Sequence, residues 1–339
     1  MKNRYLLAIV LAFACILPGT AQRYLTSVFD NVTLQTKVYG YNWTVLTVPV
    51  TGNPLLQPLV MDLYEPAGDT ETARPLVIYL HTGNFLPFPQ NQSPSGTIKD
   101  SATVEIATRL TKMGYVVAVA DYRLGWNPVA TTQDERINTL INAAYRGVQD
   151  ARTCIRHCKL NAAAYKIDST KITLFGQGTG GYIALAAATL DDIAKISNTT
   201  TPPNKFIGTN GFPMVLGFVN GNIWATDYGV VPAGPLIGDT LCQPNNVGPS
   251  SDFQLAVNLG GALADISWLE GDHPAILSIQ SPTDPFAPYT TGVVIVPGVN
   301  LPVVEVQGSY IVQQTATNLG NNDAFQNVNF TDPISVEAE

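Results

Sequence analysis

The sequence is short of charged residues and of histidine. Only 13% of its 339 residues are charged, with 18 Lys and Arg against 26 Asp and Glu, and no basic run occurs. A nucleic-acid binder needs clustered basic side chains to neutralise phosphates, so we expect no nucleic-acid partner. The three histidines and four cysteines show no spacing typical of a metal site, and we expect neither a metal nor a cofactor.

Long hydrophobic runs are also scarce. The apolar run at 6–17 follows two basic residues and precedes a small-x-small pattern that ends at Ala21. This run is too short to span a bilayer, and its flanks are typical of a secretory signal peptide. We therefore expect residues 1–21 to be a signal peptide, the mature protein to be secreted or periplasmic, and the chain to contain no membrane span.

Three cysteines, Cys154, Cys158 and Cys242, remain after that cleavage. Cys154 and Cys158 are four residues apart on a predicted helix, where a bridge between them would strain disulfide geometry. We expect three buried thiols that pack as small apolar groups. One bridge to Cys242 is the alternative, because an exported protein meets an oxidising compartment.

Apolar runs alternate with helical patterns along most of the chain. This alternation predicts an α/β fold with a mostly parallel central sheet, helices on both faces and antiparallel N-terminal strands. We expect one domain over residues 22–339, with loop insertions near 84–100 and 222–252 that form pocket rims. The expected strands lie at 44–50, 59–66, 75–81, 115–121, 171–176, 214–221, 274–281 and 301–307, and the expected helices at 101–114, 134–165 and 178–190.

A glycine-rich turn, G-Q-G-T-G-G, joins the strand at 171–176 to the helix that follows. A strand, a G-x-x-x-G turn and a helix of small residues are typical of a nucleophile elbow. The flanking positions of this sharp turn, Gly176, Gly180 and Gly181, leave no room for side chains. The helix N-terminus directs its amides at whatever the turn presents. Here the central residue is Gly178.

Four motifs in this order resemble the carboxylesterase/lipase-like α/β-hydrolases, especially the branch related to hormone-sensitive lipase and feruloyl esterases. H-T-G-N-F at 81–85 is similar to the family's H-G-G-G-F oxyanion loop, and D-Y-R-L at 121–124 to a strand end. The turn at 176–181 resembles G-x-S-x-G-G, and the stretch 274–289 resembles the strand and loop that carry the family's acid. The resemblance covers most of the mature chain and implies the α/β-hydrolase fold.

The resemblance implies roles for five positions. Asp284 matches the family's acid, and Gly178 stands at the position of the nucleophilic serine. The backbone amides near Gly83 and Asn84, with that of Thr179, would form the oxyanion hole. Because these amides do not depend on side-chain identity, we expect this hole to persist.

Two parts of the hydrolytic machinery are missing from this pattern. Glycine offers no nucleophilic atom, and the family's histidine, expected after the last helix, has no counterpart in residues 321–339. Acyl transfer needs a nucleophile and an imidazole within hydrogen-bond reach. Of the histidines present, we expect His81 to be structural, His157 to be packed in a helix, and His273 to lie at the end of the sheet opposite the ligand edge.

We expect an exported esterase-like homologue that has lost ester hydrolysis and keeps a pocket for a small ester, aromatic or carbohydrate ligand. One alternative is an active carboxylic-ester hydrolase with a non-standard triad, or with its histidine on a C-terminal segment absent from this chain. A second alternative is a structural or interaction protein on the same fold.

Overall fold

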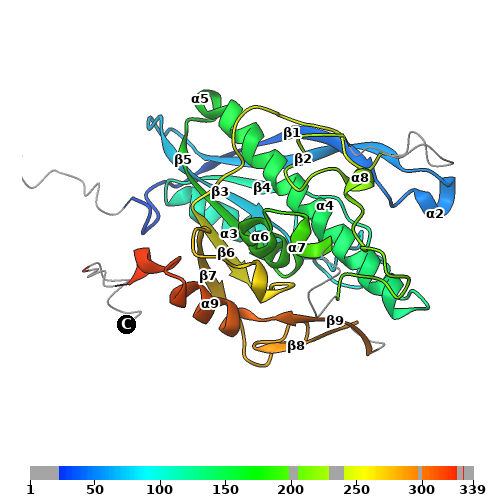
Figure 1. The fold of residues 1–339 in the computed structure, drawn as a ribbon. Coiled ribbons are helices and arrows are strands. Elements are labelled where there is room, and N and C mark those ends of the chain that lie inside the picture. The colour runs from blue at the N-terminus through cyan, green and yellow to red at the C-terminus, as the bar shows by residue number, and fades with distance from the viewer. Residues whose placement is uncertain (1–22, 198–204, 229–239, 297–299, 327–330, 332–339) are drawn as a thin grey trace, which may run out of the picture.

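The computed structural model describes residues 23–197, 205–228, 240–296, 300–326 and 331 (Figure 1). The expected signal peptide at 1–21 therefore lies outside the described residues. Within this described part, no helix is both long and apolar enough to cross a bilayer.

A seven-stranded sheet forms the centre of the molecule, in the order β1-β2-β4-β3-β5-β6-β7. β1 and β2 pair antiparallel, as do β2 and β4, whereas β4-β3, β3-β5, β5-β6 and β6-β7 are parallel pairs. The predicted mostly parallel sheet with antiparallel N-terminal strands is thus confirmed. The strands are β1 (Val32–Thr44), β2 (Leu55–Pro66), β3 (Arg74–Leu80), β4 (Val116–Ala120), β5 (Ile167–Gln177), β6 (Leu255–Leu259) and β7 (Ala275–Ile279).

Helices cover both faces of this sheet (Figure 1). Successive side chains of β3 alternate between the faces, as the pleat of a strand requires. Ile78 packs in the large core that contains residues of α4 and α6, whereas Val77 and Tyr79 pack in a smaller core with α3. The helices are α2 (Val48–Thr51), α3 (Ser101–Lys112), α4 (Gln133–Leu160), α5 (Ala162–Tyr165), α6 (Thr179–Thr189), α7 (Ala194–Ser197), α8 (Gly217–Asn220) and α9 (Ser309–Asn318), with 3-10 turns η2 (Ile266–Trp268) and η3 (Asp323–Phe325).

Two predicted strands are wrong. The segment 44–50 leaves β1 at Thr44 and turns into α2, because Pro49 lacks the N–H that a strand ladder needs but fits the first turn of a helix. The segment 214–221 contains the short helix α8 and ends at Gly221, whose φ of 70° is left-handed. The strand beside β5 is instead β6, a five-residue run that was not predicted from the sequence.

The last predicted strand, 301–307, is present as β9 but does not join the main sheet. It pairs antiparallel with β8 (Thr291–Val296) in a separate two-stranded sheet. Figure 1 shows this ribbon at the lower edge of the molecule, next to α9. The ribbon follows the loop that carries Asp284, and its residues Val294 and Ile295 contribute to the cavity described below.

A buried ion pair fixes the D-Y-R-L segment under the second loop insertion. Arg123 and Asp150 are fully buried and lie 2.9 Å apart, and Arg123 also donates to the carbonyl of Leu241 at 2.7 Å. Asn245 donates to the carbonyl of Tyr41 on β1 at 2.7 Å. The described part of the 222–252 insertion is therefore attached to the core by polar contacts.

The free thiols predicted for Cys154, Cys158 and Cys242 are confirmed, since all three are buried and unbridged.

Candidate functional site

A cavity of about 1940 Å³ lies at the carboxyl ends of the parallel strands. In open α/β sheets this edge is where ligands bind. The cavity wall includes Gly83, Asn84, Gly178, Thr179 and Asp284, so the structure brings together the predicted oxyanion, nucleophile and acid positions. The three flanking glycines of the elbow do not line it.

Those flanking glycines are required by close backbone approach. A Cβ on Gly176 would lie 1.9 Å from the carbonyl oxygen of Gly180, and one on Gly180 would lie 2.1 Å from the carbonyl oxygen of Leu80. A Cβ on Gly181 would lie 2.3 Å from Oδ1 of Asn258. Since no side chain fits at any of these positions, β5 and α6 are joined by a turn of the sharp kind predicted from the sequence.

Gly178 occupies the apex of this turn in a conformation that L-amino acids rarely adopt. Its φ is 54° and its ψ is −116°, and its N–H donates to the carbonyl of Leu259 at 2.8 Å. Glycine adopts this conformation at little cost because it has no Cβ, whereas a serine here would be strained. The elbow geometry is therefore retained although the chain has no side chain to present there.

Thr82 fills the space beside Gly178. A Cβ built on Gly178 would lie 2.2 Å from Oγ1 of Thr82 and 3.0 Å from its Cβ. Both residues line the cavity. Thr82 was not among the predicted site residues, although H-T-G-N-F has a threonine where the family's loop has a glycine.

The loop after β3 is held in a strained form. Gly83, Asn84 and Phe85 all have positive φ, at 135°, 60° and 52°. Phe85 is buried, and its carbonyl accepts hydrogen bonds from the amides of Gly125 and Trp126 at 2.9 and 3.3 Å. These contacts fix the loop over the cleft.

Three residues of the cavity wall have unpaired backbone amides. The backbone N–H groups of Gly83, Asn84 and Thr179 have no hydrogen-bond acceptor among the described residues. Thr179 is the first residue of α6, where the helix itself supplies no acceptor for the amide. Its hydroxyl contacts that of Tyr122 at 3.0 Å.

His81 is buried directly after β3, in a position that fits the structural role expected for it. Its Nδ1 donates to the carbonyl of Thr82 at 2.5 Å, and its Nε2 lies 3.2 Å from Oδ1 of Asp121. The ring is buried and stacks on Tyr122, with 4.6 Å between ring centroids. Because both ring nitrogens already have partners, this imidazole is not free to act as a base in the cavity.

Asp284 is partly buried in the loop after β7. Its Oδ1 accepts hydrogen bonds from the amides of Phe286 and Ala287 at 2.8 and 3.1 Å. No histidine, lysine or arginine of the described chain lines the cavity.

Tyr182 also lines the cavity, and its buried hydroxyl has no hydrogen-bond partner among the described residues. Burial, and after it the charge of Asp284, raises the pKa of Tyr182 well above its usual value.

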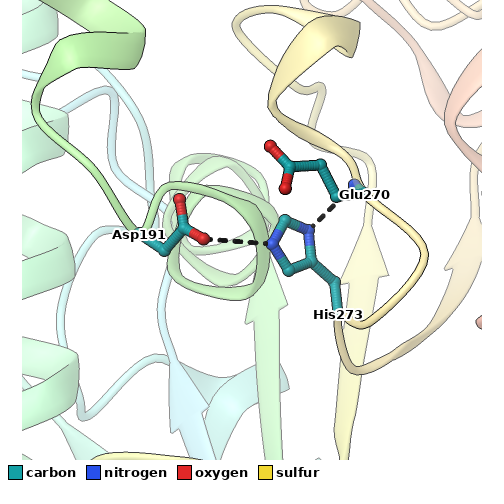
Figure 2. A group of neighbouring side chains, drawn as sticks. All are labelled: Asp191, Glu270 and His273. Carbon is teal, nitrogen blue, oxygen red and sulfur yellow. Dashed lines mark hydrogen bonds and ion pairs between the residues drawn. The ribbon is translucent and has the colours of Figure 1, made fainter.

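The remaining histidines lie elsewhere. His157 contacts the hydroxyl of Tyr165 at 2.9 Å on the helical side, and burial lowers its pKa. His273 precedes β7 and thus lies at the amino end of the sheet, as expected. Figure 2 shows His273 between Asp191 and Glu270. The three side chains are close enough to be considered as metal ligands.

Two observations oppose a metal site at this cluster. The amide of Glu270 donates to Nδ1 of His273 at 3.1 Å, so that Nε2, 3.5 Å from Asp191, carries the ring proton in the neutral imidazole. Nζ of Lys195 lies 2.7 Å from a carboxylate oxygen of both Asp191 and Glu270. The cluster already contains a cation, and this arrangement is that of a structural ion-pair network.

Comparison with known proteins agrees with the motifs. Residues 61–211 match the family model described as BD-FAE. This segment runs from β2 through the oxyanion loop and the elbow to the loop beyond α7. The resemblance to esterase and feruloyl-esterase-like α/β-hydrolases is thus confirmed. No curated protein matches the chain.

Several solved structures of one esterase from Thermogutta terrifontis are similar in fold. Its esterase 2 phosphorylated by paraoxon has a TM-score of 0.47 and 14% identity, with 85% of this chain and 79% of that chain covered. The apo form has a TM-score of 0.45 and 14% identity, with 85% and 80% covered. The propionate-bound form has a TM-score of 0.45 and 14% identity, with 85% and 79% covered.

Proposed function

We propose that this chain is a non-hydrolytic homologue of the esterase-like α/β-hydrolases that binds a small ligand in the cleft. The observation that carries the proposal is the relation between Gly178 and Thr82. The nucleophile position has no side chain, and the hydroxyl of Thr82 stands in the space that a side chain there would need.

Thr82 itself is a poor substitute for the missing serine. A hydroxyl becomes an effective nucleophile only when a base within hydrogen-bond reach removes its proton. Among the described residues of the cavity wall the ionisable groups are the carboxylates of Asp284 and Glu135 and the phenol of Tyr182. None of these is an imidazole, the group that carries both proton transfers in a Ser-His-Asp triad.

Ligand binding is supported by what the site retains. Unpaired amides on the oxyanion loop and at the start of α6 offer hydrogen-bond donors, and the remaining wall is rich in apolar side chains. A concave, mostly apolar cavity with a few polar groups is the usual form of a small-molecule site. We further propose that the protein is secreted or periplasmic, because residues 1–21 have the pattern of a signal peptide.

A turnover assay tests the loss of hydrolysis. Purified protein is incubated with p-nitrophenyl acetate and p-nitrophenyl butyrate beside its Asp284→Ala variant and buffer. We expect the same rate of nitrophenol release from both proteins as from buffer. Release well above buffer that Asp284→Ala abolishes would instead support an active hydrolase with a non-standard triad.

A further inference from the structure

We propose that the cleft binds an apolar molecule with a positively charged amine, and that Asp284 is the counter-ion of this amine. This inference rests on the proposed function, since it assigns the ligand class of the same cleft. It reassigns the acid position of the hydrolase pattern from orienting an imidazole to holding a ligand cation.

The charge of the cleft favours a cation. Its wall contains two carboxylates, those of Asp284 and Glu135, and no basic side chain from the described residues. A cleft lined by charges of one sign concentrates ligands of the opposite sign. An anionic ligand would meet these carboxylates without any compensating side-chain charge.

One carboxylate oxygen of Asp284 is hydrogen-bonded to the protein, and the other is not. Oδ1 accepts two backbone hydrogen bonds, which hold the carboxylate in place. Oδ2 accepts no hydrogen bond from the described residues. The absence of a side chain on Gly260 keeps the space beside Oδ2 clear, since a Cβ there would lie 3.3 Å from this oxygen. In a Ser-His-Asp triad the acid faces an imidazole N–H, and no imidazole lines this cavity to take that place.

Tyr182 lines the same cavity, and its hydroxyl does not occupy the free oxygen of this carboxylate. Its hydroxyl is buried and has no hydrogen-bond partner in the described part of the chain, and burial, with the charge of Asp284 after it, raises its pKa. An ammonium group has three N–H donors and no acceptor, so it suits the free carboxylate oxygen Oδ2 of Asp284.

The rest of the wall suits an apolar body. Several large apolar side chains of the cavity are exposed to solvent although they line a concave surface. A ligand that covers them gains about 25 cal/mol for each Å² of apolar surface buried. The cavity is larger than the usual range of about 300–1,000 Å³, which leaves room for an extended molecule. The exposed apolar side chains of the cavity wall are Leu46, Val48, Val129, Ile279, Phe286 and Ile295.

Three probes with the same body and different head groups test this inference: 4-phenylbutylamine, 4-phenylbutanol and 4-phenylbutyrate. Their dissociation constants are measured by isothermal titration calorimetry at pH 7. We expect the amine to bind at least tenfold more tightly than the alcohol, and the carboxylate to bind most weakly. This magnitude follows from the strength of hydrogen bonds between charged groups.

Asp284→Asn is the decisive variant, because its side-chain oxygen can still accept the amides of Phe286 and Ala287. We expect this variant to bind the amine and the alcohol within about threefold of each other, as loss of the charged hydrogen bond predicts. Asp272→Asn is the matched control, since Asp272 is exposed and does not line the cavity. This control should keep the full preference for the amine.

The outcomes separate this inference from the proposed function. Equal binding of the three probes, or preference for the carboxylate, overturns the inference and leaves a ligand-binding cleft in place. A preference for the amine that survives Asp284→Asn overturns the role of Asp284. Failure of all three probes to bind at 10 mM contradicts ligand binding by this cleft and the proposed function with it.

Discussion

The side chain of Thr82 occupies the space that a side chain at Gly178 would need. A side chain at residue 178 would begin 2.2 Å from Oγ1 of Thr82, well inside van der Waals contact. The two positions are 96 apart in the sequence and meet where β3 and β5 end side by side. The family pattern has glycine at the position of Thr82 and serine at the position of Gly178. The two departures from this pattern are therefore sterically linked, and a double-mutant cycle can measure the linkage.

Gly178→Ser should destabilise the protein by about 1–3 kcal/mol, because the new side chain meets Thr82 in a strained backbone conformation. The free energy of unfolding in urea measures this. Gly68→Ser is the matched control, since Gly68 has a φ of 77° but no atom within 4 Å of a Cβ built on it. An equal loss in both variants would show that Thr82 does not oppose a side chain at 178.

Thr82→Gly should relieve part of the cost of Gly178→Ser. We expect the double variant to be more stable than the sum of the two single changes predicts, with a coupling energy of about 0.5–3 kcal/mol. A double-mutant cycle from four urea unfolding curves gives this coupling. Additive changes within about 0.5 kcal/mol would contradict steric linkage.

Restoring the serine should not restore hydrolysis. Neither Gly178→Ser nor the double variant should release nitrophenol from p-nitrophenyl acetate faster than buffer, because no imidazole lines the cavity among the described residues. Strong turnover by either variant would reveal a base that the present account does not contain.

The sequence predicted the parts of the fold that are governed by local pattern. β3 and β4 appear as continuous apolar runs because they are buried on both faces, and the elbow was predicted because its glycines are required by backbone contact. The strand expected at 214–221 was wrong because an apolar run of that length also suits a packed turn. β6 was missed because its five residues carry little periodicity.

The sequence predicted which residues line the site but not which side chains contact one another there. The oxyanion amides and Asp284 follow from motif order, since the ends of parallel strands meet at one edge. The contact between Thr82 and Gly178 depends on the angle at which two loops approach each other, and the unpartnered hydroxyl of Tyr182 depends on packing around α6. Neither feature has a signature in residue spacing.

The buried pair of Arg123 and Asp150 should be a large contributor to stability. Asp150→Asn leaves a fully buried guanidinium without its counter-charge, and we expect a loss of about 3–5 kcal/mol in the free energy of unfolding. Asp272→Asn, at an exposed site, should change it by less than about 0.5 kcal/mol. A similar small change for both would show that Arg123 finds another partner.

The cluster of Asp191, Glu270 and His273 should stabilise the folded protein above about pH 4. Burial acts to raise the pKa of Asp191, but hydrogen bonding and charge from Lys195 outweigh it, so that the pKa is lowered below its usual value near 3.8. The contribution is therefore complete above about pH 4 and is lost as the pH falls through the lowered pKa. Asp191→Asn should be less stable than the parent protein at pH 6, and this difference should shrink by pH 3.

Urea midpoints at the two pH values measure this effect. Asp272→Asn serves again as the control, because Asp272 is not among the residues paired with Lys195 or His273. A difference between Asp191→Asn and the parent protein that stays constant from pH 6 to pH 3 would contradict the assignment.

Reaction with a fluorophosphonate tests the central claim, that this cleft holds no activated nucleophile, most directly. The protein is incubated with an excess of the reagent, which phosphonylates activated serine, threonine or cysteine side chains, and its intact mass is then measured. We predict an unchanged mass under conditions that fully label an active serine esterase. A stoichiometric adduct that maps to Thr82 or to any other residue of the cavity wall would contradict the account.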